Sequence, residues 1–333
     1  MEVVGLVDSP DHVCARYRLA ALARGLAAGG VRLTLKPLPP TPLGRLLLYR
    51  ELRPADVVIV QRKLLSRVEV AAVRRYAKRL VFDFDDAVWM RDSYRGASPD
   101  ARRSRRFRAM AAVADLVVAG NGFLAGHAAR FARPGRVRLV PTCVDPAAYP
   151  AAAHTAIGAD VRLTWVGSAS TLQGLARAAD LLAAVGRGTP GVRLRVVCDR
   201  GLTIPSLPVD VVPWAAATEA ADLAAADIGV SWIPDDDWSR GKCGLKILQY
   251  LAAGLPVVTN PVGVHPEMVT PQTGVLATTA GEWAAAVAAL AADPARRRLM
   301  GAGGRSVVAG GYGVAAAVRR WLDALGAIGP TRV

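Results

Sequence analysis

Short apolar runs alternate with longer helical segments along almost the whole chain. In the first half the apolar runs lie at residues 2–7, 31–38, 55–61, 80–86, 115–121 and 137–145. In the second half they lie at 161–167, 192–199, 209–214, 227–234, 255–260 and 273–277. Helical segments between successive apolar strands indicate parallel sheets that are covered by helices on both faces. The pattern therefore predicts an α/β fold with two successive doubly wound sheets.

A chain of 333 residues is longer than one ordinary hydrophobic core requires, so two domains are expected. The stretch 145–160 is rich in Pro and Ala and is the candidate linker. We predict an N-terminal domain at 1–150, a C-terminal domain at 151–312 and a terminal segment at 313–333 that contains a helix near 314–325. Open parallel sheets bind ligands at the carboxyl ends of their strands, which places the expected site in the cleft between the two domains.

The charge balance limits the classes of partner. A net charge of +15 and a pI of about 10.5 suit polyanions, anionic membrane surfaces or phosphorylated substrates, without choosing among them. The densest basic run, ARRSRRFRAM at 101–110, would either bind anionic lipid headgroups or form a solvated face. Phe107 is its single aromatic residue, so no nucleic-acid partner is expected.

Cysteine and histidine usage predicts neither a metal site nor a disulfide framework. The four cysteines are widely scattered, and the four histidines form no metal-ligand pattern. The first residues, MEVVGLVDSP, resemble no secretion signal, and no run of about 18 apolar residues occurs. We therefore expect a cytoplasmic protein without a cofactor, which would work at the inner face of the cell membrane if the basic run binds lipid.

One stretch, WSRGKCGLKILQYLAAGLPVV, departs from the arginine-rich background of the chain. Only five of the 42 basic residues are lysines, and Lys242 and Lys246 lie four apart in this stretch. On a helix, Lys242, Lys246 and Gln249 would share one face. Gly241 and Gly244 would let the backbone approach a ligand closely. Cations at a glycine-flanked helix start predict a diphosphate site.

The segment GKCGLKILQYLAAGLPVVTNPVGVHPEMV resembles the signature of retaining GT-B glycosyltransferases of the family-4 type. The usual pattern there is E-G-F-G-L-x-x-x-E-A-M-A-x-G-x-P-V-V, followed by G-G-x-x-E. The matching residues are Leu245, Ala252, Gly254, Pro256, Val257, Val258, Gly263, Pro266 and Glu267. The resemblance extends to TWVGSASTLQGL, VVAGNGFLAGHAARF and VRLVPTCVDPAAY, and so to most of the chain.

This resemblance implies a GT-B fold, in which two Rossmann-like domains face a central cleft and the last helix crosses back to the first domain. It also implies transfer of a sugar from a nucleotide diphosphate sugar, with retention of configuration and without an obligatory metal. The acceptor, whether a glycan, a lipid or a small molecule, is not specified.

The resemblance also implies roles for individual residues. The donor-binding candidates are Gly167, Ser168, Trp214, Arg240, Gly241, Cys243, Gly244, Gln249 and Glu267, and the catalytic candidates are Asp85, Lys242 and Lys246. Arg16, Arg18 and Asp86 are candidates for binding an acceptor or an anion. Trp214 would pack either beside the nucleotide base or in the core, and Glu219 is interpreted as a residue of a helix first turn.

The chain departs from the family pattern at two places. The two glutamates of the signature fall on Gly241 and Gln249, and the usual basic pair after the first strand of the donor domain falls on Ser168 and Gln173. We expect Lys242 and Lys246 to supply the missing cations from the opposite loop.

The acidic stretch VFDFDDAVW has several interpretations. Asp85 falls where the family often has a histidine that contacts the donor sugar. Alternatively, D-x-D binds a divalent cation as in GT-A enzymes, or Asp83 and Asp85 are the nucleophile and the acid/base of a Mg-dependent phosphatase of the haloacid-dehalogenase type, or the acids cap a turn. Clustered carboxylates repel one another, so a perturbed pKa is expected. A third function class is a GT-B-like binding subunit without turnover.

Overall fold

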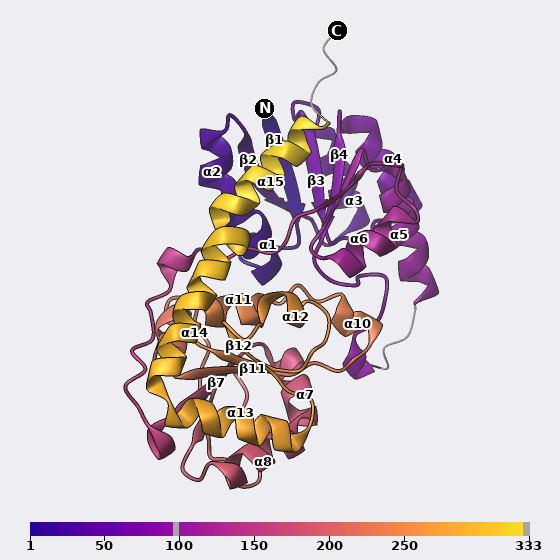
Figure 1. The fold of residues 1–333 in the computed structure, drawn as a ribbon. Helices are drawn as coiled ribbons and strands as arrows, with labels where there is room; N and C mark the ends of the chain where they lie inside the picture. The colour runs from indigo at the N-terminus through magenta and orange to yellow at the C-terminus, as the bar shows by residue number, and fades with distance from the viewer. Residues whose placement is uncertain (96–99, 329–333) are drawn as a thin grey trace. The chain divides into compact units, whose positions relative to one another are not determined.

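The computed structural model describes residues 1–95 and 100–328 (Figure 1). The chain divides into two compact units, and each is assembled from separate stretches of sequence. The first unit comprises Met1–Cys143, Asp236–Cys243 and the C-terminal segment from Val314, and the second comprises Val144–Asp235 and Gly244–Gly313. Residues 329–333 of the predicted terminal segment lie outside the described residues.

The first unit is built on a six-stranded parallel sheet with the order β2-β1-β3-β4-β5-β6. Its strands are β1 (Glu2–Val7), β2 (Arg32–Pro37), β3 (Val57–Gln61), β4 (Leu80–Phe84), β5 (Leu116–Ala119) and β6 (Val137–Leu139). Its helices are α1 (Val13–Arg18), α2 (Ala23–Ala28), α3 (Pro42–Arg50), α4 (Arg67–Tyr76), α5 (Ala101–Val113), α6 (Gly122–Ala129), α10 (Asp237–Arg240) and α15 (Val314–Gly326), with 3₁₀ turns η1 (Ala20–Leu22) and η2 (Ser93–Arg95).

The second unit contains another six-stranded parallel sheet, with the order β12-β11-β10-β7-β8-β9. Its strands are β7 (Arg162–Val166), β8 (Arg193–Val197), β9 (Val209–Val212), β10 (Ile228–Ser231), β11 (Val257–Thr259) and β12 (Gly274–Leu276). Its helices are α7 (Ala169–Arg177), α8 (Ala179–Gly188), α9 (Glu219–Ala224), α11 (Leu245–Ala252), α12 (His265–Met268), α13 (Ala280–Ala292) and α14 (Pro294–Val307), with turns η3 (Pro146–Ala148), η4 (Gly158–Asp160) and η5 (Val308–Tyr312).

Side chains of the first sheet pack into separate cores on its two faces. Val58, Val60 and Phe82 belong to one buried cluster, and the intervening Ile59 and Val81 belong to another. Because successive side chains of a strand point to opposite faces, a continuously apolar strand requires helices on both sides. The predicted pair of doubly wound α/β domains is therefore confirmed.

The last helix of the described chain, α15, packs against α2 of the first unit (Figure 1). Trp321 is 1% exposed and shares a core with residues of β1 and α2. Two glycines make the close approach feasible: a Cβ on Gly25 would lie 2.6 Å from Val318, and one on Gly29 would lie 2.7 Å from Leu322. The predicted helix near 314–325 therefore forms, and its apolar face completes the first unit's core.

Two parts of the helical pattern differ from the prediction. The single helix expected near 171–186 is two helices, α7 and α8, which meet at Ala178. Helix α14 was not expected, because its glycines lower helix propensity. Packing explains them: a Cβ on Gly301 would lie 2.1 Å from the carbonyl oxygen of Gly254, and one on Gly304 would lie 2.8 Å from Leu251.

Candidate functional site

The glycine turn before α11 decides where the two unusual lysines lie. Gly244 is the residue before the helix and has a left-handed backbone, with φ 67°. Helix α11 therefore begins at Leu245, and Lys242 lies in the preceding segment, which belongs to the first unit. The prediction that Lys242, Lys246 and Gln249 share one helix face was wrong, because the left-handed residue breaks the helix between the lysines.

Lys246 lies at the carboxyl edge of the second sheet, that is, at the end where its parallel strands have their carboxyl termini. Its Nζ donates to Thr171 Oγ1 at 3.3 Å and lies 4.7 Å from the centre of the Trp165 ring. A Cβ on Gly167 would lie 2.8 Å from the same Nζ. Lys246 thus reaches the turn between β7 and α7, where Ser168 stands in place of an expected cation.

The turn itself is closely packed, because a Cβ on Gly167 would lie 2.6 Å from Thr171 Oγ1 and from Trp165 Cη2. Gly167 follows β7 directly, and the Ser168 N–H donates to Thr171 Oγ1 at 3.1 Å. Ser168 Oγ lies 2.9 Å from Ser170 Oγ. Helix α7 starts here, so its first N–H groups and positive dipole end face the same place as the ammonium of Lys246. The arrangement can bind an anion.

A Gly167→Ala variant tests how much this turn depends on its missing side chain. The added methyl group would meet Thr171 Oγ1 and Trp165 Cη2 at 2.6 Å and Lys246 Nζ at 2.8 Å. Trp165 is buried and cannot yield, so we expect Lys246 and the turn to shift. Affinity for a nucleoside diphosphate should fall roughly tenfold or more, by the loss of about one charged hydrogen bond. Calorimetric titration measures this affinity, and an unchanged affinity would contradict the placement of the anion at the Gly167 turn.

Gln249, which stands where the signature has a glutamate, lies in a buried polar cluster. Its Nε2 donates to Glu219 Oε1 at 2.8 Å and to the hydroxyl of Tyr149 at 3.3 Å. The Trp214 indole Nε1 donates to Glu219 Oε2 at 2.6 Å. Glu219 lies in the first turn of α9, as predicted, but it is only 7% exposed and its carboxylate is held by these two donors. The contact of Glu219 with Gln249 could not be read from the sequence, because it joins α9 to α11 across 30 residues.

His265 and Glu267, both in the short helix α12, have different environments. Glu267 is exposed, whereas His265 is buried, with its Nδ1 2.9 Å from Thr259 Oγ1 and 3.0 Å from the carbonyl oxygen of Asn260. Burial, with a smaller contribution from Lys246, lowers the pKa of His265 to about 4, although the Asn260 carbonyl opposes the shift. His265 is therefore neutral at neutral pH.

The low pKa of His265 predicts a loss of stability in acid. The unfolded chain takes up this proton near pH 6.5 and the folded chain only near pH 4, so the contribution is full above pH 6.5 and is lost as pH falls through that window. The shift corresponds to about 3 kcal/mol of unfolding free energy. A His265→Asn variant should show a shallower fall between pH 7 and pH 4 in chemical denaturation. Equal slopes for parent and variant would contradict this assignment.

The acidic stretch after β4 forms an ionic cluster within the first unit. Arg62 places Nη1 2.7 Å from Asp85 Oδ1 and Nη2 2.7 Å from Asp86 Oδ2. Lys242 Nζ lies 3.0 Å from Asp86 Oδ1. Burial would raise the pKa of Asp86, but Lys242 and then Arg62 more than offset it and hold it below its usual range. The expected perturbed pKa is present, and its cause is the neighbouring cations.

Arg62, which sequence reasoning missed, has a left-handed backbone, with φ 57°. Such a conformation costs about 1 kcal/mol or more in a residue other than glycine, and it persists only where its surroundings enforce it. Here the Arg62 N–H donates to the carbonyl oxygen of Asp83 at 2.7 Å, and the side chain binds Asp85 and Asp86. A single arginine after a strand gives no sequence signal for this role.

Arg18 and Asp83 form a buried ion pair. Arg18 Nε and Nη2 donate to the Asp83 carboxylate at 3.0 and 2.5 Å, and Nη1 donates to the carbonyl oxygen of Val140 at 3.0 Å. Burial alone would lower the pKa of Arg18, but the Asp83 carboxylate more than offsets this and raises it. Arg18 is 2% exposed, so its predicted contact with a bound anion does not fit the structure. Arg16, the other candidate on α1, is half-buried above the Tyr17 ring.

The segment Asp236–Cys243 is joined to the rest of the first unit by several polar contacts. Asn121 Nδ2 donates to the carbonyl oxygens of Arg240 at 3.1 Å and of Lys242 at 2.9 Å. Cys243 is buried and donates to the carbonyl oxygen of Asp85 at 3.2 Å. A Cβ on Gly241 would lie 2.8 Å from Ala87, so this glycine serves protein packing. Of the donor-binding candidates, Arg240, Gly241 and Cys243 thus belong to the first unit, as does the catalytic candidate Lys242, whereas the other donor-binding candidates lie in the second.

Comparison with known proteins concerns mainly the second unit. Residues 153–293 match the family model described as Glycosyl transferases group 1. The matched stretch is less than half of the chain; it lies mostly in the second unit and includes Asp236–Cys243 of the first. A curated relative, D-inositol 3-phosphate glycosyltransferase from Segniliparus rotundus, is 33% identical over 222 residues, which are 59% of this chain and 48% of the relative. The chain thus spans about half the length of the curated relative it matches.

The similarity to solved structures covers nearly the whole chain, and so includes both units. Sucrose-phosphate synthase from Thermosynechococcus elongatus has a TM-score of 0.78 at 17% identity, over 98% of this chain and 99% of that one. HepE from Anabaena, solved with UDP and glucose, has a TM-score of 0.70 at 14% identity, over 98% and 100%. WaaG, a glycosyltransferase of lipopolysaccharide biosynthesis, has a TM-score of 0.63 at 16% identity, over 96% and 98%. These likenesses show the GT-B fold.

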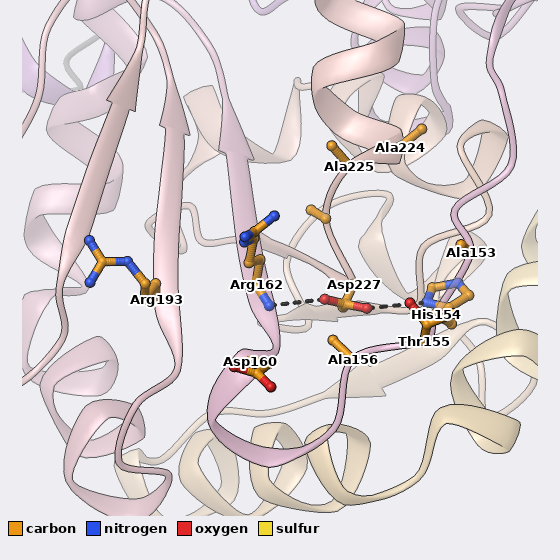
Figure 2. Close-up of a pocket in the computed structure, with 11 residues that line it drawn as sticks. Ala153, His154, Thr155, Ala156, Asp160, Arg162, Arg193, Ala224, Ala225 and Asp227 are labelled. Atoms are coloured by element: carbon orange, nitrogen blue, oxygen red, sulfur yellow. Dashed lines mark hydrogen bonds and ion pairs between the residues drawn. The ribbon is translucent and has the colours of Figure 1, made fainter.

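A pocket of about 370 Å³ lies at the opposite, amino-terminal ends of the strands of the second sheet (Figure 2). Arg162 begins β7, Arg193 begins β8 and Asp227 precedes β10, so the pocket adjoins the amino ends of these strands. Asp227 Oδ2 accepts from the Arg162 N–H at 3.0 Å, and Oδ1 lies 3.9 Å from His154 Nδ1. None of the predicted site residues lines it. Because open parallel sheets bind ligands at the carboxyl edge, we assign the candidate site there.

The predictions about metals and membranes stay open. Within the described ranges, no group of three or more His, Cys, Asp and Glu side chains is arranged to hold a metal ion. Among the described residues, none of the helices combines the length and apolar character that crossing a bilayer requires. On α5, the side chains of Arg102, Arg105 and Arg108 are exposed. Lipid binding by the run 101–108 remains a prediction.

Proposed function

We propose that the chain is a glycosyltransferase that moves a sugar from a nucleoside diphosphate sugar to an acceptor hydroxyl. The observation that carries this proposal is the ammonium of Lys246 beside Gly167 and Ser168, at the start of α7. Cleavage of a nucleoside diphosphate sugar leaves a diphosphate that gains negative charge as the bond breaks. A fixed ammonium and the N–H groups of a helix start stabilise this charge more in the transition state than in the ground state.

The finer features of the reaction are part of the same proposal. Retention of configuration and independence from metal are supported by the resemblance of residues 241–267 to the signature of retaining enzymes. Asp85, held by Arg62 at 2.7 Å, would orient the reacting sugar or stabilise positive character at its anomeric carbon. Lys242, paired with Asp86, would act from the first unit. The matched relative acts on an inositol phosphate by name, so inositol phosphates are the first acceptors to test.

Burial disfavours the phosphatase alternative. A phosphatase of the haloacid-dehalogenase type would need the Asp83 carboxylate free to attack phosphorus. Asp83 is 0% exposed, and Arg18 binds both of its oxygens. The group 1 domain match also counts against this alternative.

The proposal is tested by incubating the protein with a panel of nucleoside diphosphate sugars, with and without EDTA, and by measuring release of the nucleoside diphosphate. We expect slow hydrolysis of one donor that EDTA does not abolish and that an inositol phosphate or another hydroxyl acceptor accelerates. EDTA-sensitive release of inorganic phosphate would favour the phosphatase. Donor binding without turnover on any acceptor would favour a binding subunit.

A further inference from the structure

A carboxylate at the carboxyl edge of the second sheet is held from two sides by neutral groups. Glu219, the first residue of α9, accepts from Gln249 Nε2 on α11 at 2.8 Å and from Trp214 Nε1 at 2.6 Å. Gln249 is 3% exposed and Glu219 is 7% exposed, whereas Trp214 is 38% exposed. The carboxylate thus has a fixed orientation behind an exposed aromatic ring.

The Glu219 carboxylate lies near the carboxyl ends of the strands, where one end of an extended ligand would bind. Trp214 and Glu219 follow β9, whereas Gly167 follows β7, and β8 lies between these strands. Neighbouring strands are about 4.8 Å apart, so the two turns are separated by about 10 Å along the edge. A nucleoside diphosphate whose phosphates lie beside Lys246 and Gly167 would bring its sugar and base to this distance.

The chemistry of the cluster fits the nucleoside end. A carboxylate accepts hydrogen bonds from the neighbouring hydroxyls of a ribose, which is how acidic side chains read ribose in dinucleotide-binding folds. An exposed indole offers a flat apolar face to a base. Gln249 brings no charge of its own, but its amide holds Glu219 in position.

We propose that Glu219 binds the ribose hydroxyls of the donor, with Gln249 and Trp214 as the residues that position its two oxygens. The negative charge that the signature places on α11 is, in this chain, supplied from α9. This inference rests on the proposed function, because it assigns the nucleoside end of the donor site.

A comparison of ribo- and 2′-deoxyribonucleoside diphosphates tests the inference. A site built to accept a hydrogen bond from a hydroxyl rejects the analogue that lacks it. We expect the parent to bind the ribonucleotide about 10- to 100-fold more tightly than its 2′-deoxy analogue, and Glu219→Gln to bring this ratio close to one. Glu282→Gln, an exposed substitution of the same type on α13, should keep the parent's ratio.

A second variant keeps the inference testable if Glu219→Gln does not fold. Trp214→Phe removes the Nε1 donor and keeps a smaller aromatic ring at this partly exposed position, and we expect it to lower the ratio without abolishing binding. The inference is overturned if the parent binds both nucleotides equally, or if Glu219→Gln binds them with the parent's ratio. If the parent binds no nucleoside diphosphate at all, the proposed function fails as well, and the two failures are thus distinguishable.

Discussion

Replacing Lys246 with methionine is expected to weaken nucleoside diphosphate binding on the order of a hundredfold, because hydrogen bonds to charged groups are worth about 1.5–3 kcal/mol. Methionine keeps the length of the side chain and its packing beside Trp165 but removes the ammonium that lies 3.3 Å from Thr171. Calorimetric titration of the folded variant measures the change in Kd.

Two further lysine variants separate local from general effects of charge. Lys78→Met removes the same charge from an exposed pair with Asp56 in the first unit and should leave the affinity unchanged. Lys242→Met should weaken binding less than Lys246→Met, since the Lys242 ammonium is already engaged by Asp86 at 3.0 Å. Equal affinities for Lys246→Met and the parent would contradict the assignment of the diphosphate site.

Replacing Asp83 with alanine is expected to lower the free energy of unfolding by about 3–5 kcal/mol, the usual cost of leaving one partner of a buried ion pair alone. The variant would leave the Arg18 guanidinium, 2% exposed, without the carboxylate that binds it at 2.5 to 3.2 Å. Chemical denaturation followed by circular dichroism measures the loss.

The chain offers a matched control for this variant. Arg193 and Asp210 form an equally short pair, but their side chains are 48% and 45% exposed. Exposed pairs contribute about 0–1 kcal/mol, so Asp210→Ala should change stability little. Losses of the same size for the two variants would show that burial does not determine the contribution of the Arg18–Asp83 pair.

The fold was largely predictable because strand and helix periodicities are local. Each apolar run in the first half became a strand of one sheet, and the intervening helices cover both faces. Helix α14 was missed because its glycines, Gly301 among them, serve a contact with Gly254 that is distant in sequence. The separation of Lys242 from α11 was missed because no local pattern shows that Gly244 is left-handed; in the fold it lies against Val264 and Met268, which leave little room for a Cβ.

The site was predictable only in part, since its geometry depends on distant partners. Lys246 was singled out as one of few lysines, and it does reach the turn at Gly167. Arg18 was predicted to bind an acceptor or an anion, and its partner Asp83 was not apparent because it lies 65 residues away. Glu219 is the helix first-turn acid that the sequence predicts, but its contact with Gln249 was not predictable, because it joins α9 to α11 across 30 residues.

Hydrogen exchange of the protein with and without the nucleoside diphosphate sugar that the donor panel identifies distinguishes the proposed site from the pocket, because the two lie at opposite ends of the strands of the second sheet. We expect added protection at the carboxyl ends of the strands, in residues 167–171, 214–219 and 244–249. We expect no change around the pocket at their amino ends, in residues 153–156 and 224–227. Protection confined to the amino ends, or absent from both, would contradict the proposed site.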